Sequence, residues 1–172
     1  VEYIGFCHYR RYFNLQITQD NIDSLFRDTD VICTELIFKH MLFYEILQSV
    51  SIEDLTILIM VLKKKYPEYE NVVIDYLCGC TLYAKNMLIC KKEVFDGYAE
   101  WLFDILFECE KYIKPSPYSR GKRSFAYFGE YLLPVYLLFH HSRLKKVDYV
   151  DYVGQKKNVT IVKRIMDVIK RF

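Results

Sequence analysis

The sequence opens with Val1-Glu2-Tyr3-Ile4-Gly5-Phe6-Cys7-His8-Tyr9-Arg10-Arg11-Tyr12-Phe13, an apolar run that ends in polar and aromatic side chains. Residues 1–6 have the length and composition of a buried strand. In open α/β sheets the ligand crevice lies beyond the carboxyl ends of strands, and paired arginines suit phosphate or carboxylate. The stretch therefore predicts either an anion site, for a diphosphate, or a solvated arginine pair beside a buried histidine. Most charged pairs are surface features, which favours the second reading from this stretch alone.

Length and composition limit the class of protein. The chain has 172 residues, 52% of them hydrophobic and 17% aromatic, which predicts one domain with a sizeable core and excludes a disordered chain. Its 16 tyrosines are typical of half-buried binding grooves, membrane interfaces or partner contacts. The net charge of +2 gives no bulk attraction for nucleic acid, so no nucleic-acid partner is expected.

The six cysteines lie mostly in apolar runs, as reduced cysteines of cytoplasmic proteins do. Cys78-Gly79-Cys80 has no second Cys/His pair at zinc-finger spacing, so no metal site is expected there. No signal peptide and no apolar run of bilayer length is present, which predicts a cytoplasmic protein. Because the chain opens on Val1 in a core-type strand, we expect further residues upstream.

Periodicity and turn residues predict a helix-rich chain. Ser51 caps a helix that ends before Pro67, and Pro134 is compatible with a helix only in its first turn, so that helix should begin near Glu130 or Leu133. Residues 114–123 form a basic loop. The last predicted helix, residues 158–172, is basic and amphipathic. This pattern suits either packing on the domain or docking on an anionic membrane surface. The predicted helices are 20–26, 38–48, 52–65, 68–77, 93–113, 131–141 and 158–172, and the predicted strands are 1–6, 30–33, 87–90 and 143–153.

Four segments together resemble a bacterial family of glycosyltransferases for capsular polysaccharide and lipopolysaccharide synthesis, catalogued as a domain of unknown function. Residues 5–13 resemble its first block, with the core His-Tyr-Arg-Arg-Tyr-Phe. Residues 86–89 and 95–106 resemble the second block, Arg123 with residues 128–133 the third, and residues 66–69 a weaker spacer. The resemblance covers about residues 1–150. Tyr131 stands where the family usually has arginine.

The resemblance implies a GT-A-like α/β fold, a nucleotide-diphospho-sugar transferase sheet with flanking helices. The family's upstream strands have no counterpart here, so we expect residues 1–154 to be the C-terminal portion of such a domain and 155–172 the basic helix. The implied activity is hexosyl or galactofuranosyl transfer from a nucleotide sugar, such as a UDP-sugar, to a glycan or lipid-linked glycan. Such an enzyme works in the cytoplasm or peripherally at the inner face of the membrane, where residues 158–172 could dock.

The resemblance also assigns roles to residues of the candidate site. Arginines can neutralise a departing nucleoside diphosphate without a metal, and a single histidine lacking carboxylate neighbours is a poor metal site, so a divalent metal is compatible but not required. Glu130 is the candidate base that takes the proton of the acceptor hydroxyl. The alternative role of the same residue is to stabilise a helix N-terminus by its negative charge. The expected donor-diphosphate contacts are His8, Arg10, Arg11 and Arg123, and the expected sugar or acceptor contacts are Tyr9 and Asn86, the latter with a turn role as its alternative.

Two other functions remain open from the sequence. Abundant tyrosines also suit a non-catalytic glycan-binding or scaffold module left from a truncated glycosyltransferase. The final helix alone would suit an amphipathic, membrane-associated assembly protein. Convergence of Arg10, Arg11 and Glu130 on one pocket is the feature that would favour the enzyme.

Overall fold

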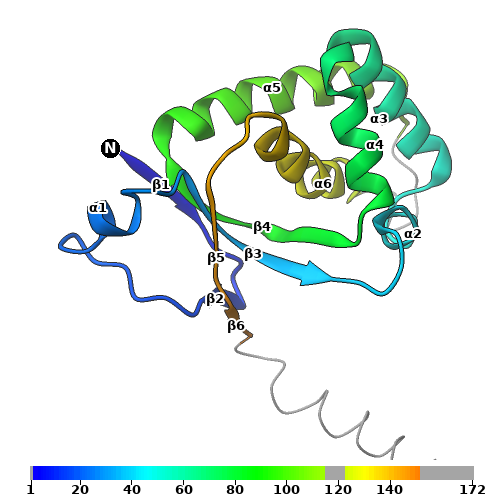
Figure 1. Ribbon diagram of the computed structural model, residues 1–172. Helices are drawn as coiled ribbons and strands as arrows, with labels where there is room; N and C mark the ends of the chain where they lie inside the picture. Colours follow the sequence, from blue (N-terminus) through cyan, green and yellow to red (C-terminus); the bar gives the residue numbers. More distant parts are fainter. Residues whose placement is uncertain (1, 115–122, 152–172) are drawn as a thin grey trace, which may run out of the picture.

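A four-stranded sheet of order β1-β4-β3-β5 forms the centre of the computed structural model, which describes residues 2–114 and 123–151 (Figure 1). β4 is antiparallel to both β1 and β3, whereas β5 runs parallel to β3. β2 and β6 pair in a separate two-stranded sheet. The strands are β1 (Tyr3–Phe6), β2 (Arg11–Phe13), β3 (Val31–Ile37), β4 (Thr81–Lys91), β5 (Leu144–Lys146) and β6 (Tyr149–Asp151).

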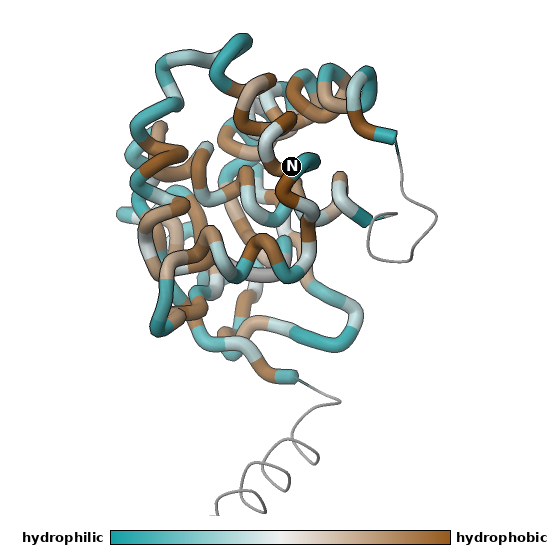
Figure 2. Tube along the Cα trace, turned by 90° about the vertical axis from the view of Figure 1, so that its right-hand side faces the viewer, coloured by the Kyte–Doolittle hydropathy of each residue, from teal (hydrophilic) through white to brown (hydrophobic). Residues whose placement is uncertain are grey.

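Most of the helices lie together on one side of the main sheet (Figure 1). They are α1 (Ile22–Leu25), α2 (Leu42–Ile46), α3 (Ile52–Lys65), the 3-10 helix η1 (Pro67–Tyr69), α4 (Glu70–Cys78), α5 (Lys92–Glu110) and α6 (Ser124–Phe139). Hydrophobic and hydrophilic residues alternate in short runs along these helices, as amphipathic helices require (Figure 2). The predicted α/β sheet with flanking helices, rich in helix, is confirmed.

The central strands are buried on both faces, and their alternation divides the core in two. On one face, side chains of β3 and β4 pack with the helices: Val31, Cys33, Leu88 and Cys90. On the other face, the alternate residues pack with the segment that leads from β2 into α1: Ile32, Met87 and Ile89 with Phe13 and Phe26. The N-terminal segment is thus part of the core.

Helix α6 contradicts the sequence prediction, because it begins at Ser124 and contains Pro134 in its interior. The proline removes a helical hydrogen bond to the carbonyl of Glu130, at a cost of about 3 kcal/mol. All residues from 131 to 137 are buried, so packing on every side of the helix outweighs that cost. The hydroxyl of Ser124, at the start of α6, donates to Asp54 Oδ2 at 2.8 Å and fastens this end to α3.

Other boundaries also differ from the sequence prediction. β1 is an edge strand of the described sheet, and Phe6 is 44% exposed, so the prediction of a buried strand at this place is wrong. β3 and β4 are longer than expected because they pair with each other over most of their length. The described part of the predicted strand 143–153, residues 143–151, does not form one strand, since β5 pairs with β3 and β6 pairs with β2.

Some predictions concern residues that the structure does not describe. The helix over 158–172, the boundary after residue 154 and most of the basic loop at 114–123 lie outside the described residues. In the described part of the chain, no helix combines the length and apolar character needed to cross a membrane.

Candidate functional site

A cavity of about 300 Å³ lies where the end of β1, the middle of β4 and the first half of α6 meet. It is lined by seven residues: His8, Arg11, Asn86, Arg123, Ala126, Tyr127 and Glu130. Five of them were candidate site residues from the sequence, namely His8, Arg11, Asn86, Arg123 and Glu130. The structure therefore brings together residues that are up to 122 positions apart in the chain. We call this cavity the cationic cavity.

A tight turn after β1 decides which side chains of the first sequence block reach the cationic cavity. The backbone N–H of Arg11 donates to the carbonyl of His8 at 3.0 Å, which closes a four-residue turn with His8 and Arg11 at its base. Tyr9 and Arg10 occupy the tip, where Tyr9 is 81% exposed and the Arg10 guanidinium lies 4.7 Å from the centre of its ring. Arg10 and Tyr9 are thus not among the lining residues, whereas His8 and Arg11 are, so the expected convergence of Arg10, Arg11 and Glu130 on one pocket is met only by Arg11 and Glu130.

The same turn orients the imidazole of His8. Its Nδ1 accepts a hydrogen bond from the backbone N–H of Arg10 at 3.2 Å, so the proton of the neutral ring is on Nε2. His8 therefore presents a hydrogen-bond donor at Nε2.

Arg11 is held by the small β2–β6 sheet. Arg11 and Asp151 are opposite each other in this antiparallel pair, and Arg11 Nε lies 3.2 Å from Asp151 Oδ2. Both side chains are about 30% exposed, so the pair itself contributes little to stability. It fixes the direction of the guanidinium, however, and it uses Nε rather than the two terminal amino groups. Asp151 is thus a partner of the site that the sequence did not identify.

Asn86 is part of a large bulge in β4. Between the pairs Cys33–Leu88 and Glu35–Tyr83, one residue of β3 is opposite four residues of β4. Asn86 has a φ of 51°, a left-handed conformation that asparagine adopts at lower cost than most residues. Bulges often redirect side chains beside functional sites. The sequence placed Asn86 at the start of a strand, but the structure places it in the interior of β4.

One face of α6 supplies the remaining lining residues. Arg123, Tyr127 and Glu130 are spaced by four and three positions, which puts them on the same side of the helix. The guanidinium carbon of Arg123 lies 5.6 Å from the centre of the Tyr127 ring, within cation–π distance. Glu130 is the seventh residue of α6, beyond the first turn in which an acid stabilises the helix dipole. The alternative role of Glu130 as a helix-start acid therefore does not apply.

The cationic cavity combines two guanidinium groups, an imidazole N–H donor, an amide and one carboxylate. Such a set can bind a diphosphate through its cations and hold a carboxylate close by for proton transfer. A divalent metal, which the sequence leaves as compatible but not required, would meet one carboxylate and two guanidinium groups in this lining. In the residues that the structure describes, no group of three or more His, Cys, Asp or Glu side chains could hold one.

Tyr127 and Ala126 are lining residues that sequence reasoning missed. The reason is the helix boundary: residues 114–123 were expected to be a loop and the next helix to begin near Glu130. With the helix extended to Ser124, the i, i+4 spacing of Arg123 and Tyr127 would have identified the tyrosine.

Comparisons with known proteins agree with this fold. The family described as "Domain of unknown function (DUF4422)" matches residues 1–142. Among solved structures, the chain is similar to the WbbM bifunctional glycosyltransferase in its apo form, with a TM-score of 0.79 and 21% sequence identity. The match covers 90% of this chain and 34% of that one, so the chain spans about a third of the WbbM chain. No curated protein matches. At this identity the similarity shows the fold alone: the α/β sheet and its helices are arranged as in part of the WbbM chain.

Proposed function

Because the chain belongs to the DUF4422 family, whose description names no activity, we propose a function from its cavity and fold. The chain carries the donor site of a glycosyltransferase that moves a sugar from a nucleotide-sugar donor to a growing glycan. The observation that carries the proposal is the convergence of His8, Arg11, Arg123 and Glu130 on one cavity. The likeness to a glycosyltransferase structure supports the same class of reaction.

In the proposed reaction the cations bind the leaving group. Arg11 and Arg123 contact the diphosphate and stabilise the negative charge that develops as the bond between the anomeric carbon and the phosphate oxygen breaks. His8 adds a hydrogen bond from Nε2. Because Asp151 and Tyr127 restrain the two guanidinium groups before substrate arrives, little reorganisation is needed when the charge develops.

Glu130 is the proposed base. The acceptor hydroxyl oxygen attacks the anomeric carbon, its proton passes to the Glu130 carboxylate, and the nucleoside diphosphate leaves with the electrons of the broken bond. Asn86 contacts sugar hydroxyls from the bulge of β4. Because α6 is buried along most of its length, Glu130 is carried by a rigid element, as a catalytic group requires.

The finer assignment follows the family resemblance. We propose a UDP-sugar donor, transfer of the hexosyl or galactofuranosyl type, and a glycan or lipid-linked glycan acceptor in bacterial capsule, lipopolysaccharide or exopolysaccharide synthesis. The reaction would take place in the cytoplasm or at the inner face of the membrane. The cations take the role that a divalent metal has in related transferases, so the proposal needs no metal.

The adjacent arginines provide a matched test. We expect UDP to raise the melting temperature of the protein, and Arg11→Ala to weaken UDP binding at least about tenfold, the effect of losing one charge-assisted contact of about 1.5–3 kcal/mol. Arg10→Ala removes the same charge outside the cationic cavity and should change UDP affinity less than about twofold. Isothermal titration calorimetry measures the dissociation constant for UDP of both variants.

Two results would reject the donor site. One is the absence of any UDP binding, and the other is an equal loss in the Arg10→Ala and Arg11→Ala variants. Binding of oligosaccharides without UDP binding would instead support a non-catalytic glycan-binding module.

A further inference from the structure

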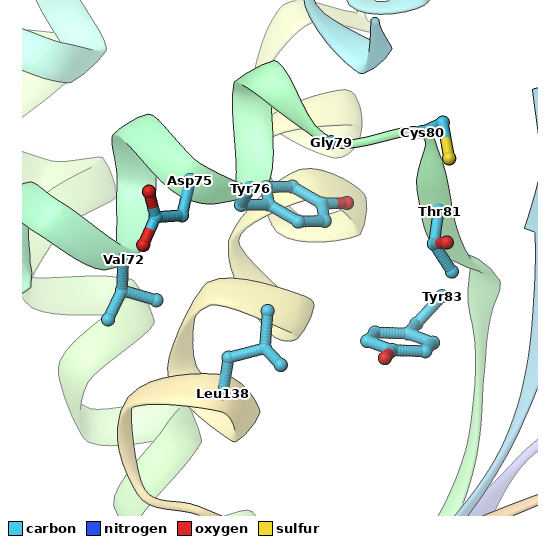
Figure 3. Close-up of a pocket in the computed structure, with 8 residues that line it drawn as sticks. All are labelled: Val72, Asp75, Tyr76, Gly79, Cys80, Thr81, Tyr83 and Leu138. Atoms are coloured by element: carbon cyan, nitrogen blue, oxygen red, sulfur yellow. The ribbon is translucent and has the colours of Figure 1, made fainter.

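A second cavity, of about 290 Å³, lies between the C-terminal end of α4, the start of β4 and the last turn of α6 (Figure 3). We call it the tyrosine cavity. Eight residues line it: Val72, Asp75, Tyr76, Gly79, Cys80, Thr81, Tyr83 and Leu138. Those from α4 share one helical face by their spacing of three and four positions. The rings of Tyr76 and Tyr83 extend from α4 and β4 into the space between these elements, close to Leu138 (Figure 3).

The lining of the tyrosine cavity favours a neutral ligand. None of its eight lining residues is a lysine, arginine or histidine, and Asp75 adds a negative charge at its side. The lining itself therefore offers no cation to a nucleotide or other anion, and the nearby Lys146, whose Nζ lies 5.7 Å from the centre of the Tyr83 ring, is paired with Glu35. Two aromatic rings, Val72 and Leu138 provide an apolar surface, and the hydroxyls of Thr81 and Tyr83 are polar groups at its edge. A sugar ring matches this mixture, because it has an apolar C–H face and a rim of hydroxyls.

Tyr76 provides an independent indication. The residue is only 5% exposed, and its hydroxyl has no hydrogen-bond partner among the described residues. Leaving a buried hydroxyl without a partner costs roughly 1–3 kcal/mol, so such groups are few in native proteins. Burial raises the pKa of Tyr76 well above its ordinary value, and the nearby Tyr131, Glu130 and Tyr83 add to the effect. Tyr76 is therefore a phenol that donates at any physiological pH.

The tyrosine cavity and the cationic cavity are both lined by residues of β4 and α6. Tyr83 and Asn86, which line different cavities, are three residues apart on β4. Leu138 and Glu130 are eight residues apart on α6, which corresponds to about 12 Å along the helix. A short oligosaccharide spans such a distance, so its end could reach the proposed base while another unit occupies the tyrosine cavity.

We propose that the tyrosine cavity binds a sugar unit of the acceptor glycan, with Tyr76 donating a hydrogen bond to a sugar hydroxyl and the Tyr83 ring packing on the sugar's apolar face. Its role as an acceptor subsite rests on the proposed transferase function, whereas sugar binding by the cavity does not.

The test uses methyl β-D-glucopyranoside, methyl β-D-galactopyranoside and methyl α-D-mannopyranoside as probes in ligand-observed NMR titrations of the full chain. Tyr76→Phe should weaken binding of the preferred glycoside roughly fivefold, the effect of one hydrogen bond of about 1 kcal/mol. It should not lower the melting temperature, because the hydroxyl has no partner in the protein.

A second variant, Leu138→Lys, blocks the tyrosine cavity at a position that is 36% exposed and should abolish glycoside binding. Its control is Ile74→Lys, which makes the same type of change on α4 outside the cavity, at a residue that is 51% exposed. Neither lysine should change UDP affinity. If no methyl glycoside binds, or if both lysine variants bind equally well, the inference is wrong even when UDP binds normally. If glycoside binding is lost only in Leu138→Lys while UDP does not bind at all, the sugar site stands and the donor-site proposal fails.

Discussion

Gly97 of α5 faces Tyr136 of α6, where the two helices contact each other. A Cβ atom at Gly97 would lie 2.5 Å from the hydroxyl oxygen of Tyr136 and 3.7 Å from its ring carbon Cζ. The tyrosine is 8% exposed, and its ring packs against Tyr98, Trp101 and His140 at centroid distances of 5.5, 5.4 and 4.3 Å. The ring therefore has little room to move away from an added methyl group.

Two opposing effects decide the result of Gly97→Ala. Alanine is favoured over glycine inside a helix by about 1 kcal/mol. Forcing a methyl group against a packed ring costs about 1–3 kcal/mol. We expect the free energy of unfolding to fall by about 0–2 kcal/mol. In a Tyr136→Phe background the nearest remaining atom is at ordinary contact distance, so the same substitution should raise stability by up to about 1 kcal/mol.

Urea denaturation of the four proteins of this double-mutant cycle measures the coupling, which should be about 1–3 kcal/mol. Gly129→Ala is the control: it is also inside a helix, but its Cβ would meet only Leu102 Cδ2, at 3.8 Å, so alanine should stabilise there. Equal effects of Gly97→Ala in both backgrounds would refute the reasoning. The contact matters for the site because Tyr98, next to Gly97, donates to the carbonyl of Gly129 at 2.8 Å, one residue before Glu130.

Three further predictions concern charged groups. The carboxylate of Asp30 accepts two hydrogen bonds from the Arg143 side chain, at 2.7 and 3.0 Å. These bonds are the main reason why the pKa of Asp30 lies well below its usual value of about 3.9. The pair therefore stabilises the fold above that pH, and this stabilisation is lost as the pH falls. Asp30→Asn should lower the free energy of unfolding by about 1–2 kcal/mol at pH 7, and a gap in thermal unfolding that persists unchanged well below pH 4 would contradict this. Glu130→Gln should keep UDP affinity within about twofold and slow sugar transfer by about 10²–10⁴ in a radiolabel assay, and unchanged transfer would exclude the base role. Asp151→Asn should raise the dissociation constant for UDP about threefold, less than Arg11→Ala does, because it only frees the guanidinium; a larger loss by calorimetry would point to direct contact.

The sequence predicts a helix correctly where residues within or next to the helix mark both of its ends. Ser51 accepts a hydrogen bond from the backbone of Asp54 at 3.1 Å, and Pro67 follows the last turn, so the predicted helix over 52–65 is confirmed at both ends. The apolar stripe of α5 likewise predicted its burial, since its repeat of three and four residues is a property of the segment itself.

Other features depended on partners that are distant in the sequence. Pro134 argued for a helix start near Glu130, but burial of α6 on all sides outweighed it. Which of two adjacent arginines enters the cationic cavity depends on the turn between His8 and Arg11, which contains no glycine, proline or asparagine to reveal it. The bulge that redirects Asn86 exists only through the pairing of β3 with β4. The composition of the site was thus predictable, whereas its geometry was not.

The composition of the cationic cavity has a consequence for the folding process. Its lining comes from residues 8–11, 86 and 123–130, so the loops that must close to form it contain tens of residues up to more than a hundred. Contacts between such distant residues form slowly, because chain entropy must be lost before they add stability. We expect α3, η1 and α4, which follow one another in the chain, to form early and the cavity late. Recovery of UDP binding during refolding would then report completion of the whole fold, and would lag behind the recovery of helical circular dichroism.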